Sequence, residues 1–413
     1  MGMLGLGIDV GALRYEKRTM QTAADAAAIA AGAELTIGDW SAAAQDAAAQ
    51  NGFTNGTNGV TVTVNNPPAT ASDPNYGNSK YVEVLVSQNQ PTYFSRVFGV
   101  SSVPMTVRAE GAQGSGQNCI YALDKNGNPA LAVDFLAFVT SQCGVVDEST
   151  NGSDALQCDI LAGINASSIG VVGKGVQDFL CSISPSPKTS ITSPGDPLAS
   201  LAAPTVGACG TTTTSPYTGY PGTTAGGLTI SGTATLNPGV YCGGLNLAPG
   251  ANVTLNTGTY ILTAAAMGTT YGLTVDLGTT VNGSSGVTFY NPAGSIRFNF
   301  TSFTTGGVDL VAPTSGTYNG ILFFQPSTNS TQAQIIGSTS YNTVLQGTYY
   351  LPGAKVVFAF DGPVQYNILD ADDIEFAVLT FGVGTFNGGK FTNNYSSLAN
   401  GSPVKGATGV LVE

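Results

Sequence analysis

The densest group of residues able to do chemistry is an acidic cluster in the segment LDADDIEF, near the end of the chain. It contains Asp370, Asp372, Asp373 and Glu375. Paired carboxylates act as general acid and base in enzymes that cleave polysaccharides, and carboxylate oxygens also bind calcium. Strand alternation would place Asp370 and Asp372 on one face. Few basic residues lie nearby in the sequence, so the simpler interpretation is a solvated strand edge or turn.

The remainder of the chain offers no further catalytic or cofactor-binding pattern. It has no histidine, and it contains no GxSxG motif, no P-loop and no dinucleotide fingerprint. We therefore expect a protein that is not an enzyme, with no catalytic residues, no cofactor and no metal site. The net charge of −12 argues against a nucleic-acid partner, because phosphate binding requires a basic face.

The six cysteines all lie between residues 119 and 242, and none belongs to a CxxC motif. Their even number, their wide spacing and a charged content of only 9% favour disulfides in an oxidising compartment. Pairing in sequence order is the simplest connectivity, but spacing alone leaves other pairings and reduced core cysteines open. The candidates are Cys119, Cys143, Cys158, Cys181, Cys209 and Cys242.

Residues 1–35 are predicted to form an apolar, alanine-rich helix. Alanine has the highest helix propensity, and a helix of small residues lets a second backbone approach closely. We expect this helix to be buried against other chains or a membrane, although it could instead pack on its own domain. No apolar run reaches the roughly 18 residues that span a bilayer. The small residues expected at the assembly surface are Gly7, Gly11, Ala23, Ala24, Ala27, Ala28 and Ala31.

Residues 36–115 are predicted to form a small α+β domain. The segment GDWSAAAQDAAAQNG reads as a second helix that ends at Asn51-Gly52, and Trp40 is expected to pack in this domain. Alternating apolar residues predict three strands, and the segment PTYFSRVFG predicts a short crossover helix between the last two. The strands are expected at residues 60–64, 80–86 and 103–111.

Residues 116–413 are predicted to form a right-handed parallel β-helix, so the whole chain combines α+β and all-β parts. The segment NPGVY recurs as NTGTY, and an aromatic pair followed by proline occurs as FYNP, FFQP and YYLP. Irregular strand-rich repeats of this kind are typical of stacked coils, although a β-sandwich remains an alternative. A segment rich in Pro, Ser and Thr at residues 182–227 is expected to be an excursion from the solenoid.

The first part of the chain resembles the N-terminal region of TadG-like proteins of the Flp/Tad pilus system. The matching residues are Asp9, Val10, Gly11, Lys17, Arg18, Gln21, Ala23, Ala24, Asp25, Ala26, Ala27 and Ala28. Such proteins usually carry a membrane-spanning segment before the D-V-G motif, whereas eight residues precede Asp9 here. The start is therefore expected to be either annotated late or produced by processing.

The resemblance implies a non-enzymatic structural protein of the bacterial cell surface, either a filament subunit or a pilus-associated component. Its expected partners are copies of itself or other pilus components, bound through the N-terminal helix, with membrane contact of the N-terminus and no nucleic acid. The alternatives are a secreted β-helix enzyme acting on carbohydrates and a glycan-binding adhesin. A convergent groove of carboxylates on one solenoid face would favour the enzyme, and a face covered by Thr and Asn would favour the structural role.

Overall fold

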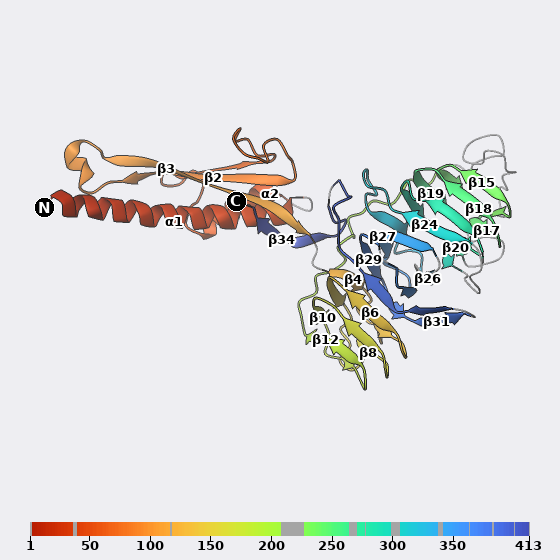
Figure 1. Cartoon of the computed structure of the whole chain (residues 1–413). Coiled ribbons are helices and arrows are strands. Elements are labelled where there is room, and N and C mark those ends of the chain that lie inside the picture. Colours follow the sequence, from red (N-terminus) through yellow and green to blue (C-terminus); the bar gives the residue numbers. More distant parts are fainter. Residues whose placement is uncertain are drawn as a thin grey trace. The chain divides into compact units, whose positions relative to one another are not determined.

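The computed structural model divides the chain into two compact units (Figure 1). Unit 1 comprises residues 1–116 and 404–413, and unit 2 comprises residues 117–403. The expected boundary at residue 35 does not separate two units, because the first helix and the small sheet belong together. The structure describes all residues except 1, 36–38, 116–117, 208–226, 264–270, 277, 299–305, 338–341, 363, 382–383, 400 and 413.

Unit 1 consists of two helices and a four-stranded antiparallel sheet in the order β1-β2-β3-β34. The side chain of Asp39 caps the second helix, because its carboxylate accepts the backbone N–H groups of Ser41 and Ala42 at 3.1 and 3.0 Å. The last strand comes from the C-terminal end of the chain, so both ends of the sequence build this unit. The elements are α1 (Gly2–Glu34), α2 (Trp40–Gln50), β1 (Thr61–Asn65), β2 (Tyr81–Pro91), β3 (Ser102–Ser115) and β34 (Lys405–Leu411).

The predicted crossover helix is wrong. Strands β2 and β3 are antiparallel neighbours, with Pro91 opposite Ser102, so the residues between them form a hairpin connection. This connection contains one short 3-10 helix, η1 (Ser95–Phe98), which ends at Gly99 in the left-handed conformation (φ 86°). A single turn of this length cannot carry the chain across a sheet, whereas it can close a hairpin.

The core of unit 1 lies between α1, α2 and the sheet. The alanines of α1 allow the helix backbone to lie close to β3, where glycine removes the opposing side chain. A Cβ at Gly32 would lie 2.5 Å from the carbonyl oxygen of Ala112, and one at Gly111 would overlap the carbonyl oxygen of Ala28. Trp40 is partly buried against the same core, as expected. Buried core residues include Met20, Ala44, Ala48, Phe53, Val62, Val82, Val84, Val86, Val107 and Ala109.

Unit 2 is a solenoid of parallel strands, and its described residues form two sheets of fourteen strands each, together with one two-stranded hairpin. A first run of the chain contributes short strands from residue 118 to residue 189. They are β4 (Asn118–Ala122), β5 (Leu131–Val133), β6 (Phe138–Ser141), β7 (Gly144–Asp147), β8 (Leu156–Cys158), β9 (Gly163–Asn165), β10 (Ile169–Val171), β11 (Val176–Gln177), β12 (Ser182–Ser184) and β13 (Lys188–Thr189).

A second run of the chain, beginning at residue 228, contributes the remaining strands. Its first strands are β14 (Leu228–Ile230), β15 (Thr233–Leu236), β16 (Gly239–Tyr241), β17 (Leu245–Leu247), β18 (Asn252–Leu255), β19 (Gly258–Leu262), β20 (Tyr271–Val275), β21 (Thr280–Gly283), β22 (Val287–Tyr290), β23 (Ser295–Phe298), β24 (Gly307–Val311) and β25 (Ile321–Phe324). Its later strands are β26 (Ala333–Gly337), β27 (Thr343–Leu351), β28 (Val356–Phe360), β29 (Asn367–Ala371), β30 (Ile374–Phe376), β31 (Val378–Phe381), β32 (Gly384–Asn387) and β33 (Gly389–Phe391), with β31 and β32 forming the hairpin.

The two runs meet in the middle of the solenoid. One sheet has the order β13-β10-β7-β4-β29-β27-β24-β21-β18-β15, so the first strand of unit 2 pairs with a strand from near its end. The chain therefore enters at a central coil, winds outward to β13, crosses to the opposite end and winds back. Sequence repeats predict stacked coils. They do not reveal the order of the coils in the stack, because the repeated motif does not specify which coil pairs with which.

The crossing segment is shorter than the predicted excursion at 182–227, because β12 and β13 already form part of the stack. Its described part, residues 190–207, is called the strap here. The carboxylate of Glu148 accepts the backbone N–H of Gly195 at 3.0 Å, and the hydroxyl of Tyr350 donates to Asp196 at 2.8 Å. The strap thus contacts coils of both runs.

The aromatic motifs form a ladder inside the solenoid. Phe289 lies opposite Phe323, and Phe323 lies opposite Tyr349, on three successive parallel strands. The ring centroids are 5.8 and 5.6 Å apart, and all three side chains are buried. Tyr241 and Tyr260, from the NPGVY and NTGTY motifs, extend this stack. The prediction that these motifs occupy equivalent positions on different coils is confirmed.

Candidate functional site

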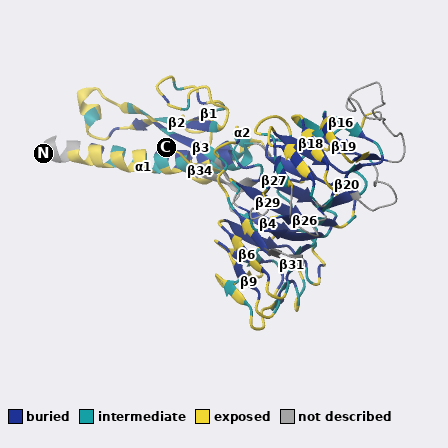
Figure 2. Ribbon diagram, turned by 45° about the vertical axis from the view of Figure 1, so that its right-hand side comes forward, coloured by how far each residue is buried: buried dark blue, intermediate teal, exposed yellow. Residues whose placement is uncertain are grey.

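The alanines expected to contact other chains lie in the core of unit 1. Figure 2 colours α1 by burial and shows both exposed and covered positions along it, and each of the five alanines is fully buried. Their small size serves contact between α1 and its own sheet, so the assignment of these residues to an assembly surface is corrected. They are Ala23, Ala24, Ala27, Ala28 and Ala31. Gly7 and Gly11 have no neighbouring atom within 4 Å of an added Cβ, and their role in assembly stays a prediction.

Two of the expected disulfides are present in unit 2. Cys119 is bonded to Cys143 and Cys158 to Cys181, with Cα–Cα distances of 5.6 and 5.8 Å. The first bond joins strand β4 to the residue before β7, and these two strands are neighbours in the stack. Cys242 is also disulfide-bonded. Its expected partner, Cys209, lies outside the described residues. The described cysteines contain no free thiol, which fits an extracellular protein.

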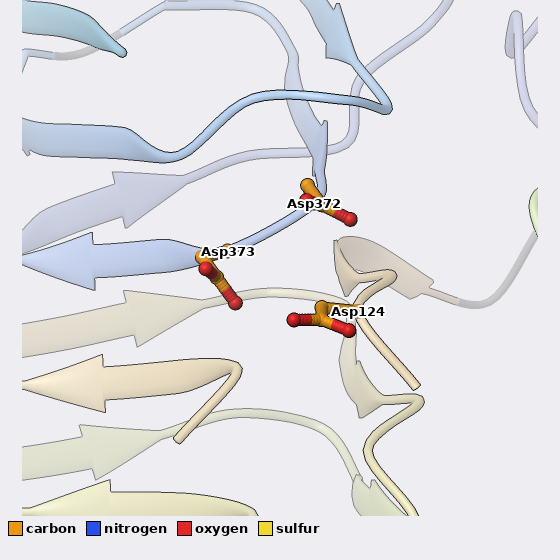
Figure 3. Close-up of side chains that lie close together, drawn as sticks. All are labelled: Asp124, Asp372 and Asp373. Atoms are coloured by element: carbon orange, nitrogen blue, oxygen red, sulfur yellow. The ribbon is translucent and has the colours of Figure 1, made fainter. Parts of the chain in front are cut away.

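Three carboxylates gather where the two runs of unit 2 meet. Asp124 follows β4, and Asp372 and Asp373 follow β29, the strand paired with β4. One oxygen from each side chain lies within 4.8 Å of the others, and Figure 3 shows the three carboxylates around a common space. The backbone N–H of Asp124 also donates to the carbonyl of Asp372 at 3.0 Å. Hard cations such as calcium prefer oxygen ligands of this kind.

Asp370 does not belong to this group, so the expected pairing of Asp370 with Asp372 is wrong. Asp370 lies within β29, and its side chain is fully buried, whereas Asp372 lies in the turn that follows. Asp370 therefore does not lie at the solvated edge that was expected for this segment. Burial and the adjacent Asp196 of the strap raise the pKa of Asp370 well above its usual range. A protonated carboxyl at this position is compatible with the apolar interior.

A surface cavity of about 440 Å³ lies beside the three carboxylates and is lined by further charged residues. Glu375 in β30 is in register with Ala132 in β5, which is in register with Gln157 in β8, so their side chains share one sheet face. Lys355, just before β28, forms an ion pair with Glu375 at 2.6 Å. Asp134, just after β5, also borders the cavity. We call this cavity the carboxylate cleft.

The carboxylates of the cleft have altered proton affinities. Partial burial, together with the neighbouring Glu375, raises the pKa of Asp134 to about 6. Partial burial, together with Asp124 and Asp372, raises the pKa of Asp373 to about 6. Carboxyl groups with such values can exchange protons near neutral pH, as general acids and bases do. The cleft thus brings together carboxyl groups from both runs of the chain.

Sequence reasoning found Asp372, Asp373 and Glu375 but missed Asp124, Asp134 and Lys355. The missed residues come from the first run of the chain or from another coil, and the pairing of β4 with β29 and of β5 with β30 brings the runs together. The segment LDKNGN around Asp124 carries a turn pattern, and Asp124 does accept the backbone N–H of Asn126 at 2.8 Å. That pattern indicates a turn and gives no sign of its distant neighbours.

Comparison with known proteins gives one finding, at the N-terminal end. Residues 1–34 match the family model described as "Putative Flp pilus-assembly TadE/G-like", in agreement with the resemblance seen in the sequence. This match covers α1. Neither the curated proteins nor the solved structures included a match to the chain. None of the helices in the described part of the chain combines the length and apolar character that crossing a bilayer requires.

Proposed function

We propose that this protein is a non-enzymatic structural component of the bacterial cell surface that works with a Tad-type pilus. The match of residues 1–34 to the pilus-assembly family carries the proposal. Disulfides between neighbouring coils support a location outside the cytoplasm. The buried aromatic ladder stabilises the core of unit 2, as a solenoid exposed at the cell surface requires.

The packing of α1 limits how the helix can take part in assembly. Its alanines are covered by the chain's own sheet, so a second chain would contact the end nearer the N-terminus. Gly7 and Gly11 are four residues apart and leave room beside the helix, as in helix pairs that pack through small residues. We place the contact with other pilus components at these glycines.

Deletion of the gene in its own bacterium tests the pilus role. Negative-stain microscopy should show loss or shortening of surface filaments, and antibodies against unit 2 should label filaments or their base in the wild type. Unchanged filaments together with the absence of surface label would refute the role.

The glycines are tested by Gly7→Leu combined with Gly11→Leu. Because no atom lies within 4 Å of either added Cβ, the double variant should fold normally and lose filament association. The matched control is Gly152→Leu in unit 2, where an added Cβ also meets no atom within 4 Å, and it should behave as the wild type. Normal filaments in the double variant would show that the contact lies elsewhere.

The carboxylate cleft favours a second candidate function, action on carbohydrates. A carboxyl group at Asp134 with a raised pKa lies beside Glu375 and Lys355, and glycan-cleaving sites commonly combine two carboxyl groups in an open cleft. The experiment is incubation of the purified chain with acidic and neutral polysaccharides, followed by measurement of new chain ends. Turnover that Asp134→Asn abolishes and the exposed control Asp178→Asn retains would establish the enzyme and refute the structural proposal.

A further inference from the structure

The connection between β2 and β3 exposes an unusual amount of apolar surface. Val97 and Phe98 are 82% and 84% exposed, more than any other large apolar side chain in the described part of the chain. Tyr93, Phe94 and Val100 in the same connection are also exposed. Figure 2 shows this connection as an exposed turn at one end of unit 1. We call residues 93–100 the apolar tip.

The apolar tip is fixed to α1 by a single buried carboxylate. Asp9 accepts the backbone N–H groups of Tyr93, Phe94 and Ser95 at 2.8, 3.1 and 2.7 Å, and the hydroxyl of Ser95 at 2.8 Å. Burial opposes its ionisation, but these hydrogen bonds prevail and hold the pKa of Asp9 at about 2. The exposed side chains of the tip are therefore presented in a defined conformation beside the helix.

Exposed apolar and basic residues also occur in the first half of α1, on either side of Asp9 and in the turns that follow it. Ile8 and Val10 flank Asp9 and are 55% and 41% exposed. The exposed cations of the helix follow within the next turns, and one more lies in the tip itself. They are Arg14, Lys17, Arg18 and Arg96, four of only 13 lysines and arginines in a chain of net charge −12. Arg96 lies within the apolar tip, and the three cations of α1 follow Val10 by four to eight residues, with the half-buried Glu16 among them.

We propose that the apolar tip and the adjacent N-terminal turns of α1 dock on the surface of an anionic lipid bilayer. Exposed Phe, Val and Tyr side chains can enter the boundary between headgroups and acyl chains, and flanking Arg and Lys side chains can bind lipid phosphates. An anionic lipid surface fits this region because its exposed cations can bind lipid phosphates, although the chain as a whole has a net charge of −12. The proposal does not depend on the pilus role.

The apolar part is tested by sedimentation of the full chain with vesicles of phosphatidylcholine and phosphatidylglycerol. Val97→Ser combined with Phe98→Ser should lower the partition coefficient about tenfold or more, because both side chains lose most of their apolar area. Both residues are exposed, so the melting temperature should not change. The matched control is Phe179→Ser in unit 2, where the side chain is 78% exposed, and it should bind vesicles as the wild type does.

The charged part is tested by Arg14→Gln and Arg96→Gln. Each should weaken binding to the anionic vesicles about fivefold at low salt and leave weak binding to pure phosphatidylcholine vesicles unchanged. Equal vesicle binding by the wild type and the Val97→Ser/Phe98→Ser variant, or no binding by the wild type, would overturn the proposal. Concentration-dependent dimers that this variant abolishes, without vesicle binding, would assign the tip to a second copy and also overturn it.

Discussion

Removal of one aromatic ring from the ladder of unit 2 should destabilise the solenoid more than any surface change. Phe323 is the residue to change, because its ring lies between Phe289 and Tyr349 at centroid distances of 5.8 and 5.6 Å and meets Phe298 edge-on at 6.1 Å. Its side chain is fully buried. Phe323→Ala would therefore leave a cavity bordered by three rings.

The cost can be worked out from two contributions. Truncation of a buried Phe to Ala typically lowers the free energy of unfolding by about 3–5 kcal/mol. Each lost ring pair contributes about 0.5–1.5 kcal/mol within that range. Phe323→Leu keeps most of the volume and loses the ring contacts, so it should cost about 1–2 kcal/mol. Because each coil depends chiefly on its neighbours, the loss should also make the unfolding transition less cooperative.

The assay is equilibrium unfolding of the full chain in guanidinium chloride, followed by circular dichroism and by tyrosine fluorescence. Phe179→Ala is the control, because Phe179 is 78% exposed and should change the free energy of unfolding by less than about 0.5 kcal/mol. If Phe323→Ala and Phe179→Ala destabilise equally, the aromatic ladder does not support the core, and the reasoning from recurring motifs to stacked coils fails.

Four further predictions concern protonation, the tip, the helix and the cysteines. Burial and Glu148 raise the pKa of Asp147 to about 8, so folding binds a proton between about pH 4 and pH 8. The penalty grows from about pH 4 to pH 8 and reaches up to about 4 kcal/mol at pH 7, and urea unfolding of Asp147→Asn should show higher stability without this pH dependence. Asp9→Ala should accelerate hydrogen exchange of the tip amides; unchanged exchange would contradict its anchoring role. Ala27→Leu should lower the melting temperature of unit 1, since overpacking costs about 1–3 kcal/mol, and an unchanged melting temperature would contradict the buried position. Mass spectrometry of the unreduced protein should find no alkylated cysteine, and labelling of several would contradict the disulfides.

The sequence predicted the elements whose signals are local. Recurrent aromatic pairs identified Phe289, Phe323 and Tyr349 as equivalent positions because parallel stacking places like residues in ladders. High alanine content predicted α1 correctly as a helix that needs close packing. The same composition could not show whether the closely packed partner was another chain or the sheet of its own unit. Gly111 opposite Ala28 decides the matter, and that glycine lies far along the chain.

Only some of the residues that line the carboxylate cleft could be predicted from the sequence. Asp373 and Glu375 stood out as an acidic cluster, but Asp134 comes from the first run and reaches them because β30 pairs with β5. Nothing in a local pattern specifies which coil lies beside which. Strand alternation also failed for Asp370 and Asp372, because the strand ends at Ala371 and the chain turns before Asp372.

The order of coils in unit 2 has a consequence for how such a protein can change in length. Its first strand, β4, and its last, β33, both lie in the interior of the stack, so the two outer ends are formed by the middle of the sequence. Coils could be gained or lost at either end through insertions or deletions near residues 190–227, and the positions where the chain enters and leaves the solenoid would stay in place. The length of the solenoid could then vary without any change in the rest of the molecule.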